Sequence, residues 1–160
     1  DKEVNKLFKE IRREDRKIGP EEAIEILKKG EYGILSTVGE DGYAYGVPLN
    51  YVYVDNSIYF HCAKEGHKLD NIKNNMRVSF CVVGETKPIP EKFTTRYESV
   101  IVFGKAMEIF NEEKEKALLE IIYKYANQYI EQGKEYIKKA KDKTVIIKIN
   151  IEKITGKARR

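Results

Sequence analysis

The apolar positions near the start of the chain repeat with the period of a helix. From Glu3 to Arg13 they fall on one helical face, which predicts a first short helix. A second helix is expected to begin at Pro20, because proline suits the first turn of a helix, and to end at Gly30. The pattern therefore predicts N-terminal helices within residues 3–29.

From Tyr32 onward the apolar residues gather in short runs that are rich in β-branched and aromatic side chains, as is typical of strands. The first three runs are YGILSTV, YAYGVPLNYVYV and SIYFHCA, and the turn sequences GEDG and DNS separate them. They predict a meander of three strands. The next run, EGHKLDNIKNN, has the spacing of a short helix, and RVSFCVVG returns to a strand.

Three further segments complete the predicted order. The run YESVIVFGKAMEIF predicts a long strand in which Gly104 is a candidate for a bulge. Residues 111–140 predict a helical insert, with Gly133 as a candidate to interrupt it. The run TVIIKINIEKI alternates with period two before the basic tail TGKARR. The strands are thus expected within residues 31–110 and 143–153.

Six predicted strands with peripheral helices favour a mainly β fold. A closed or nearly closed antiparallel barrel would remove the sheet edges that otherwise pair with other chains. An α+β sandwich also combines half-buried strands with surface helices, and periodicity does not separate the two. The length of 160 residues suits a single domain over residues 1–160.

The composition of the chain argues against several classes of binding partner. The net charge of +4 comes from 30 basic and 26 acidic residues spread along the chain, which indicates a mixed solvated surface and no nucleic-acid partner. The two cysteines, Cys62 and Cys81, lie apart in apolar runs, so neither a disulfide framework nor a zinc site is expected. No apolar stretch reaches the roughly 20 residues that cross a bilayer. We therefore expect a cytoplasmic protein with no membrane partner and no metal.

The segment HCAKEGHKLDN combines the features of an anion site. A strand, a turn and a helix start follow one another, and helix N-termini offer free N–H groups and a favourable dipole. Gly66 permits close approach of a ligand to the backbone, and His67 and Lys68 stand at the helix start. The alternative is an ordinary solvated turn with two basic residues. Likewise, His61 suits either a ligand contact or a hydrogen-bonded packing position.

The run from Tyr45 to Phe80 resembles the flavin-binding half of the pyridoxamine 5′-phosphate oxidase-like split-barrel superfamily, and most closely its nitroimidazole-resistance (5-nitroimidazole reductase) family. The resemblance follows the same order over most of the chain. It includes RREDR, GILSTVGEDGYAYGVPLNY, YFHCAKEGHKLDN, YESVIVFGKA and the terminal ITGK.

The resemblance implies a six-stranded antiparallel split β-barrel that forms a homodimer, with FMN bound at the subunit interface. VPLN stands where pyridoxamine phosphate oxidases carry a more basic segment, and no arginine-rich C-terminal substrate site is found, so their activity is not implied. Carried onto this sequence, the ring would lie along Val47, Pro48, Leu49 and Asn50, the phosphate would lie among His61, Gly66, His67 and Lys68, and Ser99 would contribute from a later strand.

Two functions remain open at this stage. The first is an FMN-dependent oxidoreductase that passes electrons from reduced nicotinamide, NADH or NADPH, to a small acceptor such as a nitroaromatic. The scarcity of paired catalytic side chains suits it, because the cofactor carries the chemistry, and His61 is the candidate general acid. The second is a non-catalytic module that binds FMN or haem for storage or sensing.

Overall fold

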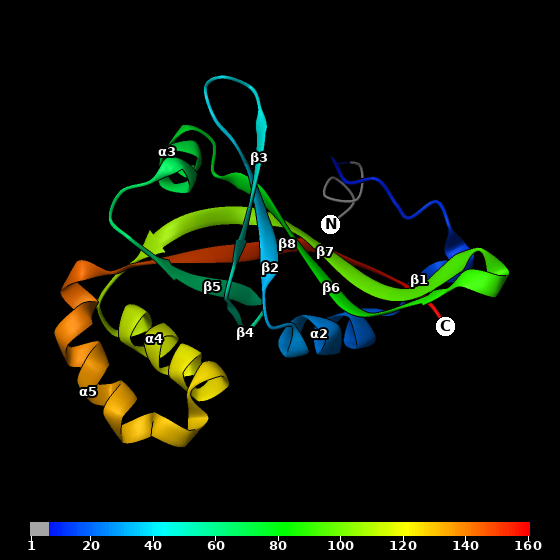
Figure 1. Ribbon diagram of the computed structural model, residues 1–160. Helices are drawn as coiled ribbons and strands as arrows, with labels where there is room; N and C mark the ends of the chain where they lie inside the picture. Colours follow the sequence, from blue (N-terminus) through cyan, green and yellow to red (C-terminus); the bar gives the residue numbers. More distant parts are fainter. Residues whose placement is uncertain (1–6) are drawn as a thin grey trace.

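The computed structural model describes residues 7–160 (Figure 1). The strands are β1 (Lys17–Ile18), β2 (Gly33–Val38), β3 (Ala44–Leu49), β4 (Val52–Val54), β5 (Ser57–Cys62), β6 (Arg77–Ile89), β7 (Thr94–Ile109) and β8 (Val145–Arg159). The α-helices are α2 (Pro20–Lys29), α3 (His67–Asn74), α4 (Asn111–Tyr125) and α5 (Ile130–Ala140). Short 3₁₀ turns are η1 (Glu14–Arg16), η2 (Pro90–Lys92), η3 (Asn127–Tyr129) and η4 (Lys141–Lys143).

The strands form one antiparallel sheet in the order β3-β2-β6-β7-β8-β5-β4, and β1 adds to β8. Within residues 7–160, β3 and β4 are not hydrogen-bonded to each other, so the strongly curved sheet is not closed (Figure 1). This arrangement confirms the mainly β, split-barrel class. The core lies inside the curve and includes Leu35, Phe60, Phe80, Val102 and Ile149.

The strand count differs from the predicted six for two reasons. The two-residue β1 pairs with the end of β8, and the run expected as one strand from Tyr43 to Val54 breaks into β3 and β4. The break falls at Tyr51, whose ring is fully buried and whose hydroxyl donates to the carbonyl of Leu27. This bond fixes the break between β3 and β4 against α2.

The long strands β7 and β8 carry the predicted bulge. Their pairing shifts register between Phe103 and Gly104, so Gly104 is confirmed as the irregular position. A side chain there would collide with the backbone of Asn150. β8 continues to Arg159, so the segment expected as a basic tail is a strand paired with β7.

The helical insert folds as a hairpin of α4 and α5 over the β4–β5–β8 side of the sheet (Figure 1). The predicted interruption at Gly133 is wrong, because the chain leaves the α-helix at Ala126 and passes through η3. Gly133 lies inside α5, where it is buried against Ile122 of α4. It serves close helix packing rather than a turn.

The N-terminal segment departs from the predicted helix over 3–13. Residues 8–13 are not helical, and residues 3–6 lie outside the described part of the chain. Phe8 instead stacks on Phe103 of β7, with ring centroids 5.0 Å apart. The second predicted helix is confirmed as α2, and Gly30 is its C-cap. Throughout residues 7–160, no helix is both long enough and apolar enough to span a membrane.

Candidate functional site

The N-terminus of α3 has the donors that an anion needs. The helix follows β5 directly after a turn that ends at Gly66, and within residues 7–160 no side chain caps its first turn. The first N–H groups are therefore open to a ligand. A Cβ on Gly66 would meet no atom of the described chain within 4 Å, so the space beside the helix start is open. This cradle suits a phosphate.

Lys68 brings positive charge to the same place. Its side chain is half-buried in the first turn of α3, close enough to His61 at the end of β5 to act on that ring. Partial burial of the ring, and then the Lys68 ammonium, hold the pKa of His61 below its ordinary value. Burial also raises the pKa of the neighbouring Cys62 thiol. At neutral pH His61 is therefore a neutral imidazole beside Lys68, whereas the Cys62 thiol lies in the hydrophobic core.

His67 joins α3 to β3. Its imidazole lies against the phenol ring of Tyr45, with centroids 3.9 Å apart and the planes inclined by 31°. Aromatic rings at this separation attract each other beyond simple burial. The contact places the start of α3 beside the strand that carries the VPLN sequence.

α3 is also fastened to β2. The buried amide of Asn71, 4% exposed, donates to the hydroxyl of the buried Thr37 over 3.0 Å. Nearer the surface, the amide of Asn74 donates to the carbonyl of Val38 over 3.3 Å. Together with the His67 contact, these bonds fix the helix against the β2–β3 end of the sheet.

β3 lies at one end of the sheet, with β2 as its strand neighbour in the described chain, so its other backbone edge is unpaired. Val47 and Leu49 pack towards the core, whereas Pro48 is exposed on the opposite face. Proline is tolerated in strands mainly at such edges. The exposed Asn50 donates its amide to the carbonyl of Glu31, which fixes the chain as it leaves β3.

Ser99 lies away from this cluster in the single chain. Ser99 is a residue of β7, and it pairs with Val83 of β6 on one side and with Lys157 of β8 on the other. The α3 end of β2 is instead level with Ser79 of β6. Four residues of strand separate the two levels, which is roughly 13 Å along β6. Of the expected site residues, one chain brings together His61, Gly66, His67 and Lys68. The VPLN residues extend from Tyr45, beside α3, towards the level of Ser99, because Pro48 pairs with Ile34, Ile34 with Cys81, and Cys81 with Ile101. Ser99 itself is separated from β3 by β2 and β6.

Tyr45 is a residue of the site that the sequence did not predict. The strand period carried a signal for it. Tyr45, Val47 and Leu49 are spaced two residues apart, so their side chains lie on the same face of the strand. That it meets His67 could not be read from the sequence, because the contact joins two elements whose relative position the sheet sets.

The sequence model of the family described as pyridoxamine 5′-phosphate oxidase matches residues 19–158. The chain belongs to the pyridoxamine 5′-phosphate oxidase family. The family match spans α2, α3 and nearly all of the sheet, including the edge strand β3. No curated protein matches the chain.

Solved structures with this fold include proteins of different description. A candidate 5-nitroimidazole antibiotic resistance protein from Bacteroides thetaiotaomicron is 23% identical, with a TM-score of 0.73 and coverage of 89% of this chain and 86% of that one. A FAD-binding protein from Mesorhizobium loti is 23% identical, with a TM-score of 0.63 and coverage of 91% of this chain and 98% of that one. A heme storage protein from Vibrio cholerae is 12% identical, with a TM-score of 0.65 and coverage of 86% of this chain and 94% of that one. These likenesses show the shared fold.

Proposed function

We propose that this member of the pyridoxamine 5′-phosphate oxidase family binds FMN and acts as an oxidoreductase. The observation that carries the proposal is the uncapped start of α3, with Lys68 in its first turn and the open edge of β3 beside it. When bound, FMN supplies the electron transfer, from reduced nicotinamide to a small acceptor such as a nitroaromatic. The described FAD-binding and nitroimidazole-resistance structures support this reading of the fold.

The chain's own residues divide into phosphate and ring contacts. The first N–H groups of α3 and the Lys68 ammonium bind the phosphate, while Gly66 leaves room for it and Tyr45 holds His67 in place. The backbone edge of β3 through Val47–Asn50 meets the polar edge of the ring, because its N–H and C=O groups are open to a ligand.

His61 is the candidate proton donor or acceptor at the site. Its depressed pKa keeps the ring neutral at pH 7, so one nitrogen can donate a hydrogen bond while the other accepts one. A phosphate beside Lys68 would offset the lysine charge and bring the pKa of His61 closer to neutrality, where proton transfer is efficient.

A homodimer completes the proposed site. Within one chain, Ser99 lies roughly 13 Å along the sheet from the α3 level, and β2 and β6 separate its strand from β3, so a second chain would have to supply its contact. The outer face of β6 and β7 exposes two large apolar side chains, Val83 and Ile101. Exposed apolar surface on a sheet commonly marks a protein interface.

Titration of the purified protein with FMN tests the binding proposal. We expect quenching of flavin fluorescence and an absorbance shift that saturate at one FMN per chain. A protein that takes up no FMN at micromolar concentration would contradict the proposal, whatever acceptor or donor is then tried.

Stopped-flow mixing of the FMN-loaded protein with NADH or NADPH under anaerobic conditions separates an oxidoreductase from a storage or sensing module. Bleaching of the flavin absorbance near 450 nm, followed by its return on addition of a nitroaromatic, is the result expected of the enzyme. A flavin that stays oxidised would indicate a binding module. Haem titration completes that comparison, since a neutral exposed imidazole such as His61 can also bind haem iron.

A further inference from the structure

The side chain of Lys124, near the end of α4, reaches two other segments of the chain. Its ammonium donates to the carbonyl of Gly30 over 2.6 Å and to the carbonyl of Tyr51 over 2.9 Å. Gly30 is the C-cap of α2, and Tyr51 lies in the break between β3 and β4. One lysine therefore fastens the helical hairpin both to the end of α2 and to the place where the chain leaves β3.

Tyr125, the next residue of α4, contacts the same junction. Its hydroxyl accepts the N–H of Tyr51 over 3.0 Å, and it lies 2.7 Å from the carbonyl oxygen of Glu31 and 2.9 Å from that of Tyr51. A phenol has one hydrogen to donate, so it satisfies only one of these two carbonyls at a time. Lys124 is therefore the donor that keeps the Tyr51 carbonyl satisfied while Tyr125 donates to Glu31.

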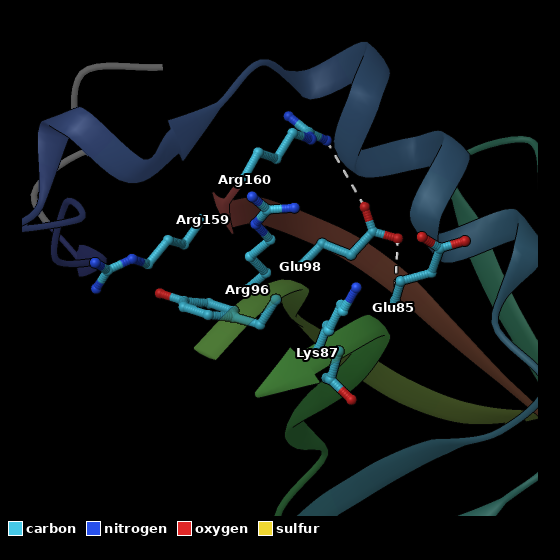
Figure 2. Close-up of a pocket in the computed structure, with 8 residues that line it drawn as sticks. Glu85, Lys87, Arg96, Glu98, Arg159 and Arg160 are labelled. Carbon is cyan, nitrogen blue, oxygen red and sulfur yellow. Dashed lines mark hydrogen bonds and ion pairs between the residues drawn. The ribbon is translucent and has the colours of Figure 1, made fainter. Parts of the chain in front are cut away.

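The charge of Lys124 is held without a carboxylate. Its side chain is half-buried, and among residues 7–160 no carboxylate oxygen lies within 4.0 Å of its nitrogen. Arg160, by contrast, is exposed and lies 3.7 Å from Glu98 (Figure 2). Besides the two carbonyl oxygens, the phenol rings of Tyr51 and Tyr125 surround the ammonium, with centroids 4.0 and 5.1 Å from the nitrogen. Burial therefore lowers the pKa of Lys124 to about 8.

Such a cation adds little to the stability of the fold. Taking an ammonium out of water opposes the gain from its new contacts, and carbonyl oxygens offset that loss less than a carboxylate does. What Lys124 does control is the position of one short segment. Asn50, the last residue of VPLN, donates its amide to the Glu31 carbonyl, so the bonds of Asn50, Lys124 and Tyr125 form one network between the end of β3 and the end of α2.

We propose that Lys124 is a positioning residue of the flavin site, which holds the Asn50–Tyr51 end of the VPLN segment against the C-cap of α2. The inference rests on the proposed function, because Val47–Asn50 is the segment that would meet the flavin ring. The hydrogen bonds of a charged ammonium are roughly twice as strong as those of a neutral amine. The segment is therefore held more tightly below pH 8 than above it. The α4–α5 hairpin acts on the ring in this way, whereas α3 acts on the phosphate.

Fluorescence titration of the full chain with FMN tests the inference. Lys124→Met keeps the length of the side chain and removes its donors, so it should weaken FMN binding about 5-fold at neutral pH. Lys124→Arg restores a cation with donors and should stay within about 2-fold of the original protein. Lys116→Met, at an exposed position of the same helix, is the matched control and should leave FMN binding unchanged.

The pH profile separates positioning from a purely structural role. Between the folded pKa of about 8 and the ordinary value of 10.5, the unfolded chain holds a proton on Lys124 that the folded chain has lost. The Lys124 contribution to the free energy of unfolding therefore rises with pH across this window. FMN affinity should change in the opposite direction and fall about 3-fold from about pH 7 to about pH 9, because the ammonium loses its charge. In Lys124→Met and in Lys124→Arg, FMN affinity should not change over this range.

The inference is overturned if Lys124→Met binds FMN as the original protein does, or if Lys116→Met loses as much affinity. A flat pH profile of FMN affinity in the original protein also overturns it, and that result does not depend on any variant folding. In the double variant with Lys68→Ala, the two losses should multiply, because the residues act on different parts of the ligand. Losses that do not multiply would assign both residues to one contact and overturn the inference. Failure of the proposed function is distinguishable, since the original protein then takes up no FMN.

Discussion

The imidazole of His67, at the first position of α3, lies 3.9 Å centroid to centroid from the phenol ring of Tyr45 in β3. The two residues are 22 positions apart in the chain. Their contact holds the helix start and the edge strand together, and both are needed if one ligand is to meet a phosphate cradle and a backbone edge at once.

Tyr45→Leu should loosen the flavin site without unfolding the protein. The aromatic pair is worth about 0.5–1.5 kcal/mol, so FMN affinity should fall roughly 3- to 10-fold in a fluorescence titration. Tyr43→Leu is the matched control, because Tyr43 is 77% exposed on the same hairpin. Equal loss in both variants would contradict a role for the Tyr45–His67 contact.

Lys68→Ala should change both FMN binding and the titration of His61. Loss of the charge-assisted phosphate contact should weaken FMN by about 1–3 kcal/mol. Without the neighbouring cation, the pKa of His61 should rise part of the way to its ordinary value of 6.5, since burial is the larger cause of its depression. NMR titration of the His61 ring measures the pKa, and Lys73→Ala, at the other end of α3, should leave both quantities unchanged.

The same shift has a consequence for stability. Below pH 6.5 and above the lower native pKa, the unfolded chain holds a proton on His61 that the folded chain does not. Protonation of His61 therefore favours the unfolded chain, and the free energy of unfolding decreases as pH falls from 6.5 towards the native pKa. Lys68→Ala should narrow the window, and urea unfolding at several pH values would show a shallower acid-side slope. An unchanged slope would mean that the two groups do not interact.

Ile101→Lys should convert a dimer to a monomer. A charge in the middle of the apolar outer face of β6 and β7 would oppose burial of that face against a second chain. Light scattering after size exclusion gives the mass, and FMN binding should weaken along with the dimer. Tyr136→Lys, on the exposed side of α5, should leave both unchanged. A parent protein that is already monomeric would refute the shared site.

Asn71→Ala should destabilise the fold more than Asn74→Ala does. It removes the amide that satisfies the buried Thr37 hydroxyl, and leaving a buried polar group without a partner costs about 1–3 kcal/mol. Asn74 makes its bond at the surface, where water can replace it, so we expect under about 0.5 kcal/mol there. Urea unfolding compares the two. A larger loss for Asn74→Ala would contradict the assignment of Asn71 as the main fastener of α3.

Gly133→Ala tests the packing of α4 against α5. The added Cβ would lie 2.6 Å from Cγ2 of Ile122, and overpacking of this kind costs about 1–3 kcal/mol, more than the roughly 1 kcal/mol gained in helix propensity. Combining it with Ile122→Ala removes the clash, so the pair should be less destabilised than the sum of the single variants. Strict additivity in thermal unfolding would show that the two residues do not compete for space.

Much of the fold could be predicted from periodicity. The period-two runs after Tyr32 identified the strands, and the Pro20 and Gly30 signals gave the bounds of α2, because these features depend on local chemistry. Gly104 was identified as a bulge on the same basis. The predicted helix over 3–13 fails within residues 8–13, where Phe8 stacks on Phe103 across a long sequence separation.

The candidate site was partly predictable. The helix start at His67 and the lysine beside it are local features, and the sequence identified both. Tyr45 and Asn71 were missed because their partners, His67 and Thr37, lie on other elements.

The sequence by itself determined the position of α2 and of most strands, which faces are apolar, and that a strand, a turn and a helix start surround Gly66. Those properties depend on neighbouring residues and on period. Only the tertiary structure decided that the sheet stays open with β3 at its edge, and that Ser99 lies away from α3. Register and strand order depend on contacts between distant segments, and a single sequence carries no local signal for them.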